Sequence, residues 1–204
     1  MIAVTETLRN RIRFGQNLRH KLKRSDQSLW KTSLRKHDPV EIIFATNRDR
    51  IPELVPIKMA RMAVSPFGYF RGNVPVMAAD LATLPRTGIE VQICGDAHVR
   101  NLGAFAALDG RMIFDLNDFD ETIRGPWEWD LKRLVTSLVL AGRQAHHSDN
   151  SCRDAVLTCV ETYRAKALEL LTEVKPVIEA RAGMSLEDWA AAVIANTPIG
   201  RNIA

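Results

Sequence analysis

Two short apolar runs joined by an Asp-Gly pair constrain the fold of this chain most strongly. Residues 102–108 and 111–114 flank Asp109-Gly110. An Asp-Gly pair between apolar runs is a strong β-hairpin pattern, because a two-residue hairpin turn requires a positive φ at both central positions. Another apolar run, residues 89–94, precedes this segment and predicts a strand. The sequence therefore predicts a strand, a loop and a β-hairpin in succession.

Polar side chains follow the predicted strands. Asp96 comes directly after the first strand, Asn101 lies five residues further on, and Asp115 ends the hairpin. We expect these three side chains to face one small volume. A single Asp or Asn is common in turns for conformational reasons alone, so the prediction depends on the group. Carboxylate and amide oxygens without a thiolate suit a hard cation such as Mg²⁺.

The hairpin and the loop after it are unusually acidic. Residues 109–121 contain five acidic residues and one basic residue, and Asp118 lies in the middle of the acidic loop. Carboxylates this dense repel one another unless a cation or arginines gather them. A calcium loop is not indicated, because the twelfth position from Asp115 or Asp118 is Pro or Trp. Zinc is not indicated, because His98 has no second His or Cys at ligand spacing.

Most of the remaining chain has helical spacing, and the predicted fold class is α+β, mainly helical. Asp38-Pro39 is a favourable helix start. Segment 65–72 contains a proline and two glycines and is predicted to be a non-helical loop that positions Arg71. Arg71 either caps a helix or pairs with an acid, or its planar fork binds phosphate; both readings stay open. Helices are predicted over residues 5–24, 39–47, 53–63, 74–84 and 127–145, and a last one starts at residues 148–151 and stops before Pro176.

The charges divide the chain into a basic arm and an acidic body. Residues 1–36 contain ten Lys/Arg and two acids, and the remainder contains eighteen Lys/Arg and twenty-two acids. This predicts a basic helical N-terminal arm, residues 1–36, and a body, residues 37–204. A basic arm can bind nucleic acid or anionic lipid, but a solvated amphipathic helix also explains it, and nucleic acid is not the expected partner.

The cellular compartment follows from what the sequence lacks. Three cysteines do not form a disulfide framework, which favours a reducing compartment. The N-terminus has no apolar signal-peptide core, and no apolar run is long enough to cross a bilayer. The expected location is cytoplasmic, without a membrane partner, and the sequence does not set the oligomeric state.

Gly95-Asp96-x-His98-x-x-Asn101, followed by Phe114-Asp115, resembles the catalytic core of protein-kinase-like and aminoglycoside-phosphotransferase-like enzymes. The resemblance implies the C-terminal, catalytic lobe of the protein-kinase-like fold, with a small β-hairpin that bears the metal site. It assigns Asp96 as the base or orienter of an accepting hydroxyl, and Asn101 and Asp115 as Mg²⁺ ligands.

Further residues receive roles from the same resemblance. Asp118 is expected to assist in binding the metal and cofactor, and His98 and Arg71 are further catalytic candidates. Asp130 resembles the Asp of an Asp-Leu pair that begins a helix bracing the catalytic loop, and Gly95 is expected to support that loop. By their charge and position alone, independently of the resemblance, Lys132 and Arg133 on this helix are candidates to balance the carboxylates.

The chain is also similar to a bacterial family classed as a domain of unknown function, number 2252 in its series (DUF2252). That name implies no activity. The stretches that carry the resemblance are residues 54–58, 61–62, 65–72, 95–98, 114–121 and 125–134.

One departure from the kinase pattern concerns the phosphates of ATP. Neither a glycine-rich loop nor a strand lysine, which kinases use to hold them, precedes Asp96. The DUF2252 resemblance implies that both follow the catalytic motifs in a permuted order. Residues 37–204 are therefore expected to be a catalytic lobe truncated before the nucleotide-binding segment, and inactive when isolated from it.

Three functions remain open. The leading one is Mg²⁺- and ATP-dependent transfer of a phosphoryl group to an unknown hydroxyl of a small molecule or protein, with nucleotidyl transfer as a variant. The second is a metal-dependent phosphohydrolase built on Asp96, Asp115, Asp118 and Asp120. The third is a non-catalytic fragment whose basic arm binds nucleic acid.

Overall fold

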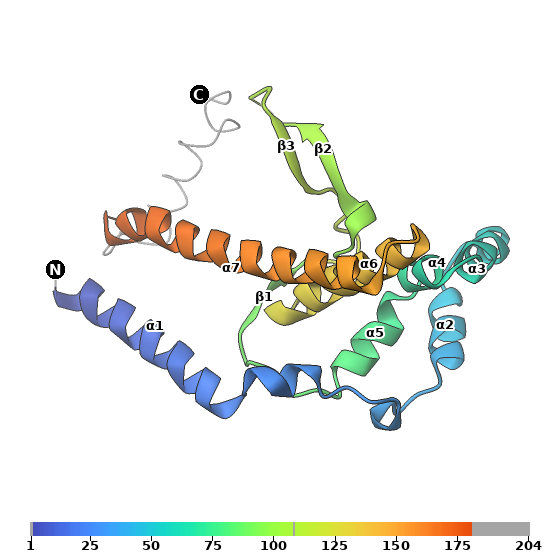
Figure 1. Cartoon of the computed structure of the whole chain (residues 1–204), viewed down its shortest axis with the longest axis horizontal. Coiled ribbons are helices and arrows are strands. Elements are labelled where there is room, and N and C mark those ends of the chain that lie inside the picture. Colours follow the sequence, from blue (N-terminus) through green and yellow to red (C-terminus); the bar gives the residue numbers. More distant parts are fainter. Residues whose placement is uncertain (1, 108, 181–204) are drawn as a thin grey trace.

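Helices dominate the described part of the chain, residues 2–107 and 109–180 of a computed structural model (Figure 1). The helices are α1 (Ile2–Lys21), α2 (Pro39–Asn47), α3 (Val55–Ala63), α4 (Pro66–Arg71), α5 (Val74–Leu81), α6 (Trp127–Gln144) and α7 (Asp149–Ala180). The strands are β1 (Glu90–Ile93), β2 (Leu102–Ala106), β3 (Met112–Leu116) and β4 (Ile123–Pro126). The predicted class, α+β and mainly helical, is confirmed. The prediction that the last helix stops before Pro176 is wrong, because α7 continues to Ala180. Residues 181–204 of the predicted body lie outside the described residues.

Helix α2 begins where the sequence predicts. The side chain of Asp38 accepts a hydrogen bond from the Val40 amide at 2.8 Å, and Pro39 occupies the first helical position. The carboxylate satisfies an amide that has no partner within the helix, and proline already has the required φ. Behind this start, Ile43 of α2 packs with Met62 of α3 and Val76 of α5 in a small apolar core.

Helix α4 corrects the prediction of a loop at residues 65–72. Ser65 is its N-cap, and its hydroxyl accepts from the Gly68 amide at 3.0 Å, while Pro66 opens the helix. Gly68 lies so close to α3 that an added Cβ would be 2.7 Å from the Arg61 carbonyl oxygen. The proline and glycine that suggested a loop therefore serve a helix start and a close helix–helix contact.

The predicted hairpin is present as β2 and β3, paired antiparallel from Leu102↔Leu116 to Ala106↔Met112. Its turn differs from the expected two-residue form, because Gly110 takes a positive φ and Asp109 does not. The amide of Gly110 donates to the Ala107 carbonyl at 2.9 Å. Of the two residues expected at the turn, only Gly110 therefore needs the conformational freedom of glycine.

The strand predicted at residues 89–94 is β1, and it pairs antiparallel with β4, a strand that the sequence analysis does not predict. Gly125 of β4 faces Ile93, whose Cδ1 would be 2.9 Å from an added Cβ, and Pro126 ends the strand opposite Glu90.

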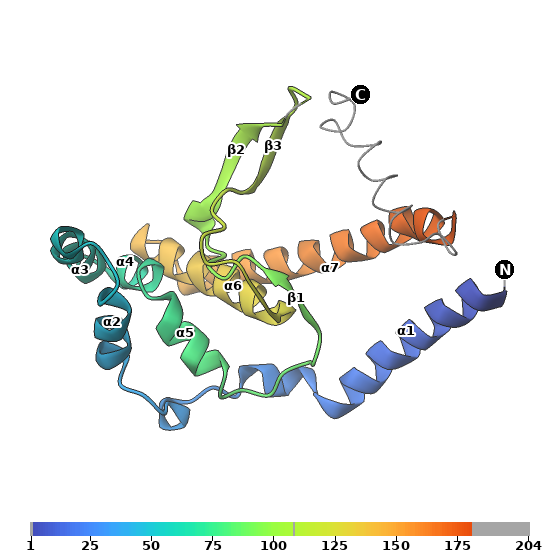
Figure 2. The same ribbon diagram turned by 180° about the vertical axis from the view of Figure 1, so that it is seen from behind.

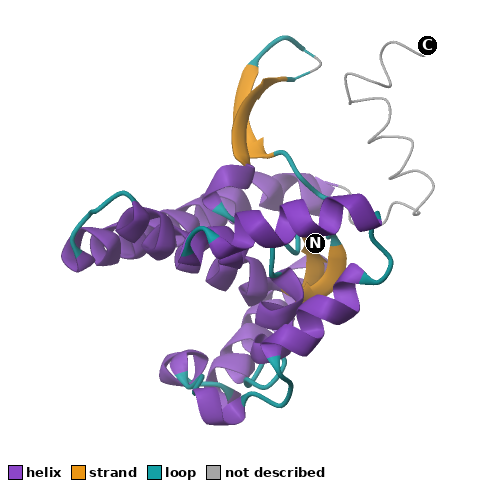
Figure 3. Ribbon diagram, turned by 90° about the vertical axis from the view of Figure 1, so that its right-hand side faces the viewer, coloured by secondary structure: helices purple, strands orange, loops and turns teal. Residues whose placement is uncertain are grey.

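The two sheets lie in different surroundings. Figures 1 and 2 show β1 against α6, whereas the β2–β3 hairpin projects away from the helices. Figure 3 shows the same projection from the side. Helix α7 runs along α6, and α1 extends outward from the rest. Across the described residues, none of the helices has the length and apolar character required to cross a membrane.

The contact between α6 and α7 gives a stability prediction at Gly142. An added Cβ there would be 2.6 Å from the Sγ of Cys152, which is 4 % exposed. We expect Gly142→Ala to lower the free energy of unfolding by ~1 kcal/mol, because overpacking outweighs the gain in helix propensity. Urea denaturation measures the change.

The matched control is Gly15→Ala on α1, where the nearest atom to an added Cβ is a flexible Arg19 nitrogen at 4.0 Å. This substitution should leave the stability unchanged or slightly raised. The loss of stability caused by Gly142→Ala should be smaller in the Cys152→Ala variant than in the wild type, because the clashing sulfur is gone. An equal loss in the wild type and in Cys152→Ala contradicts the steric explanation.

Candidate functional site

The chain turns sharply where β1 ends, and this turn requires glycine. Gly95 has a φ of +84°, and an added Cβ would collide with the carbonyl oxygen of Glu121. A residue with a side chain would suffer both backbone strain and this clash. Gly95 therefore allows the acidic loop to pass close to the strand end and delivers Asp96 beyond it.

Asp130, in the first turn of α6, holds this turn from the other side. Its Oδ2 accepts a hydrogen bond from the Cys94 amide at 2.6 Å, and its Oδ1 accepts from the Gly95 amide at 3.0 Å. Charge-assisted hydrogen bonds of this kind are short and strong. One carboxylate thus fixes two consecutive amides, which sets the direction in which the chain leaves β1.

Asp96 forms a largely buried ion pair with Arg133 of α6. The Nε and Nη2 atoms of Arg133 both lie 2.6 Å from Oδ1 of Asp96. Nη2 also donates to the Phe70 carbonyl oxygen at 2.9 Å, and the guanidinium lies 4.2 Å from the centre of the Phe70 ring. The Arg133 side chain is 3 % exposed and that of Asp96 is 17 % exposed. Burial lowers the pKa of Arg133, and Asp96 opposes this shift.

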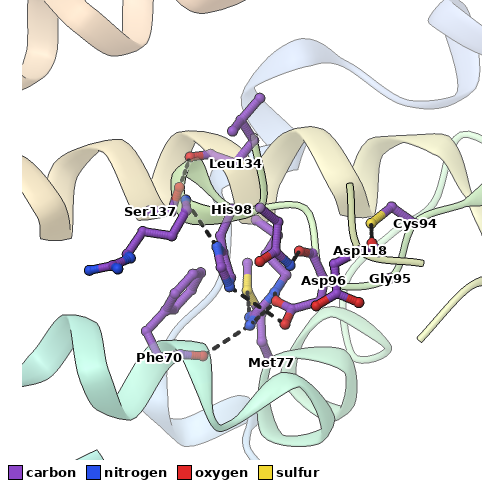
Figure 4. Close-up of polar contacts among 12 residues, drawn as sticks. Phe70, Met77, Cys94, Gly95, Asp96, His98, Asp118, Leu134 and Ser137 are labelled. Carbon is purple, nitrogen blue, oxygen red and sulfur yellow. Dashed lines mark hydrogen bonds and ion pairs between the residues drawn. The ribbon is translucent and has the colours of Figure 1, made fainter. Parts of the chain in front are cut away.

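His98 lies beside the carboxylate, as Figure 4 shows. Its Nδ1 accepts from the Arg100 amide at 3.2 Å, so the proton of the neutral ring is on Nε2, 3.6 Å from Oδ2 of Asp96. Burial lowers the pKa of His98, Arg133 and Arg71 lower it further, and Asp96 opposes them. The ring is 2 % exposed, so it can orient Asp96 but has little access to a substrate.

Asn101 closes the loop onto Asp96. Its Nδ2 donates to the Asp96 carbonyl oxygen at 3.0 Å, and its own amide donates to the His98 carbonyl at 2.9 Å. Using Nδ2 in this way leaves the amide oxygen as the atom suited to a cation. Asp96, His98 and Asn101 therefore form one hydrogen-bonded loop, in which the carboxylate of Asp96 is the most exposed of the three side chains.

The remaining metal candidates lie on and after the hairpin. Asp115 pairs with Gly103, near the hairpin base, and its Oδ1 accepts from the Leu116 amide at 2.8 Å. Asp118 lies beside the residue that follows β1, since its carbonyl accepts from the Cys94 Sγ at 3.1 Å. Both side chains are exposed. Over residues 2–107 and 109–180, no three His, Cys, Asp or Glu side chains form a group that could hold a metal ion.

Arg71 ends α4 and is exposed. It is close enough to His98 to affect its pKa, which places it near the loop. Ser137 is a residue that the sequence analysis misses. It is fully buried, accepts from the Val99 amide at 3.0 Å and donates to the Leu134 carbonyl at 2.6 Å. The signal that could have revealed it is the polar spacing i, i+3, i+7 from Asp130 through Arg133 to Ser137, on one face of a helix.

The fold and site together define a mainly helical α+β protein in which helix α6 holds the loop at the end of a short strand and pairs its buried Arg133 with Asp96 of that loop. Residues 50–193 match the family described as "Uncharacterized protein conserved in bacteria (DUF2252)", and the chain belongs to this family. No curated protein and no solved structure matches it.

His98 gives the site a pH-dependent stability. Its pKa is lowered in the folded state, so between that value and the unfolded value of about 6.5 the unfolded chain binds more protons. Its contribution to stability is therefore complete above about pH 6.5 and is lost as the pH falls through the folded pKa. One group gives at most ~1.4 kcal/mol per pH unit.

Melting temperatures between about pH 7.5 and 5.5, a range that spans the ordinary histidine pKa, test this. We expect His98→Asn, which keeps an acceptor for the Arg100 amide, to flatten the decline. The exposed His37→Asn is the control and should keep the wild-type slope. An unaltered slope in His98→Asn contradicts the assignment.

Proposed function

We propose that this protein is the catalytic lobe of a Mg²⁺- and ATP-dependent phosphotransferase that acts on a hydroxyl acceptor. The observation that carries the proposal is how Asp96 is held. Arg133 binds its carboxylate, Asn101 binds its carbonyl, and Asp130 binds the two amides before it. A carboxylate this firmly oriented, yet still partly exposed, suits a group that must align an attacking hydroxyl.

Each neighbour of Asp96 has a distinct task in this proposal. Arg133 occupies Oδ1, so Oδ2 is the oxygen that would accept the hydrogen bond of the incoming hydroxyl. His98, neutral and with its Nε2 proton facing Oδ2, would restrict the rotation of the carboxylate. Arg71, exposed beside the loop, would supply a cation for a phosphate.

The donors at the site suit Mg²⁺ by their chemistry. Asn101 supplies an amide oxygen, and Asp115 and Asp118 supply carboxylates, which are hard ligands of the kind that Mg²⁺ prefers. These three residues would hold the ion, and it would neutralise charge on the phosphates. The same cradle also suits nucleotidyl transfer, and the acceptor is a small molecule or a protein.

Nucleotide binding tests the cofactor part of the proposal. Calorimetry with ATP, with and without Mg²⁺, should give binding that depends on the ion, and Asp115→Ala should weaken it at least ~10-fold, because a ligand carboxylate is lost. Asp109→Asn, on the same hairpin and paired with Arg111, is the control and should bind normally. ATP binding is measured both for the 204-residue chain and for the protein translated from its full open reading frame. Binding that is absent from both, or is unaffected by Asp115→Ala, rejects the proposal.

Asp96 tests the chemical step. With labelled ATP and a pool of hydroxyl compounds, we expect Asp96→Asn to lower the transfer rate by ~10²–10⁴-fold, because the amide cannot accept the proton. ATP affinity should stay within about threefold, because Asp96 is not assigned to the nucleotide or the metal. Transfer that persists at the wild-type rate removes Asp96 from the reaction.

A further inference from the structure

A pocket lies between α4, α5, α6 and the segment that follows α1. Its volume is ≈ 400 Å³, within the range of small-molecule sites. Trp30 lines it from the segment after α1, Tyr69 and Phe70 line it from α4, and Met77 lines it from α5. Lys132 completes the wall from α6. Most of the lining is apolar, so the accessible polar groups determine which class of ligand would bind.

Three aromatic side chains give the pocket its apolar character. Trp30 is 36 % exposed and Tyr69 is 39 % exposed, so a large part of each ring is uncovered. The Phe70 ring is held in place, because the Arg133 guanidinium lies 4.2 Å from its centre. Exposed apolar surface gathered around a cavity is typical of a ligand site. Aromatic walls of this kind suit a flat apolar body.

Most polar groups of the lining are already paired or out of reach. Nε of Arg35 donates to Oδ1 of Asp80 at 2.9 Å, so these two charges neutralise each other. The hydroxyl of Thr136 donates to a carbonyl of its own helix at 2.7 Å. The amide oxygens of Gln27 and Asn73 are fully buried and cannot meet a ligand. None of these groups therefore selects the ligand by its charge.

Lys132 is different, because its ammonium group makes no hydrogen bond or ion pair to any residue that the structure describes. Lys132, Val135 and Thr136 have the spacing i, i+3, i+4 and all line the pocket, so the lysine side chain leaves α6 on the side of the pocket. It is half-buried. Burial lowers the pKa of Lys132, and Glu128, one turn earlier, opposes this shift.

Glu128 does not take the place of a ligand. Its two carboxylate oxygens accept from the amide and the hydroxyl of Thr87, each at 2.9 Å, and Glu128 is 4 % exposed. Lys132 therefore remains a partly desolvated cation without a partner of its own, which an anion would stabilise. A singly charged anion suits the site better than a dianion, because Asp80 also lines the pocket.

We propose that this pocket binds a small aromatic carboxylate, with its ring against Trp30 and Phe70 and its carboxylate paired with Lys132. The proposal concerns a site separate from Asp96 and does not depend on the proposed phosphotransfer.

The probes 2-naphthoate and 2-naphthamide form a matched pair, because they share the ring system and nearly the same shape but only naphthoate is charged. We expect naphthoate to bind with a dissociation constant of about 1 mM, typical of a fragment of this size, in ligand-observed NMR titrations. Naphthamide should bind at least ~5-fold more weakly, because it forms no ion pair. Failure of naphthoate to bind, or equal binding of the two probes, overturns the proposal.

Lys132→Met tests the ion pair, because it removes the charge and keeps most of the length of the side chain. It should abolish the preference for naphthoate while keeping or raising the melting temperature, since a partly desolvated cation is lost. Lys132→Arg keeps a cation and should keep the preference. The control is Lys58→Met, because Lys58 is also half-buried but its Nζ donates to Oδ1 of Asn47 at 3.0 Å. That variant should keep the preference and lower the melting temperature.

Trp30→Ala tests the position of the ring. It should weaken both probes by at least ~5-fold and keep the ratio of their affinities, because it removes an apolar wall and leaves Lys132 in place. If Lys132→Met keeps the preference for naphthoate, or if Trp30→Ala leaves both affinities unchanged, the probe does not occupy this pocket in the proposed way and the proposal fails.

Discussion

The buried guanidinium of Arg133 is the constraint on which the rest of this structure depends. Removing such a charge from water costs several kcal/mol even after the protein relaxes. The cost is offset because the guanidinium has four partners: the Asp96 carboxylate, the Phe70 carbonyl, the Phe70 ring and the Met77 sulfur. These partners belong to the loop after β1, to α4 and to α5, so burying one side chain of α6 requires all three segments to be in place.

Helix α6 acts as a template for the loop through one polar stripe. Asp130 binds the Cys94 and Gly95 amides, Arg133 binds the Asp96 side chain, and Ser137 binds the Val99 amide. Most of these contacts reach backbone atoms. The loop is therefore positioned by directional hydrogen bonds rather than by apolar packing, and directional bonds define the orientation of Asp96 more narrowly than packing would.

The sequence predicts those features that depend on neighbouring residues. The Asp38 cap and the β2–β3 hairpin follow from local chemistry, and both are confirmed. The errors arise where a distant contact determines the outcome. Position 68 of helix α4 is glycine because α3 passes too close for a side chain. Position 125 of β4 is glycine because Ile93 of β1 occupies the space that a side chain would need. The composition of either segment alone does not reveal these contacts.

In the candidate site, too, the local features can be predicted from the sequence and the long-range contacts cannot. The Asp96–Asn101 spacing is visible in the sequence, but the pairing of Asp96 with Arg133 spans 37 positions and depends on the packing of α6 against β1. Ser137 escapes notice because serine in a helix usually faces solvent or bonds its own backbone. Only the fold reveals that it also holds the loop.

The outer part of the β2–β3 hairpin differs from the Asp96 loop, because it projects away from the helices and α6 does not hold it. Phe114 on β3 is 71 % exposed, and a two-stranded hairpin by itself is marginally stable in water. Asp115, however, lies near the base, where Leu102 pairs with Leu116 and the Asn117 amide donates to the Asn101 carbonyl at 2.9 Å. The backbone around Asp115 is thus tied directly to Asn101. Movement at the hairpin tip would change its position little, so a site that used both residues could keep its geometry while the outer strands move.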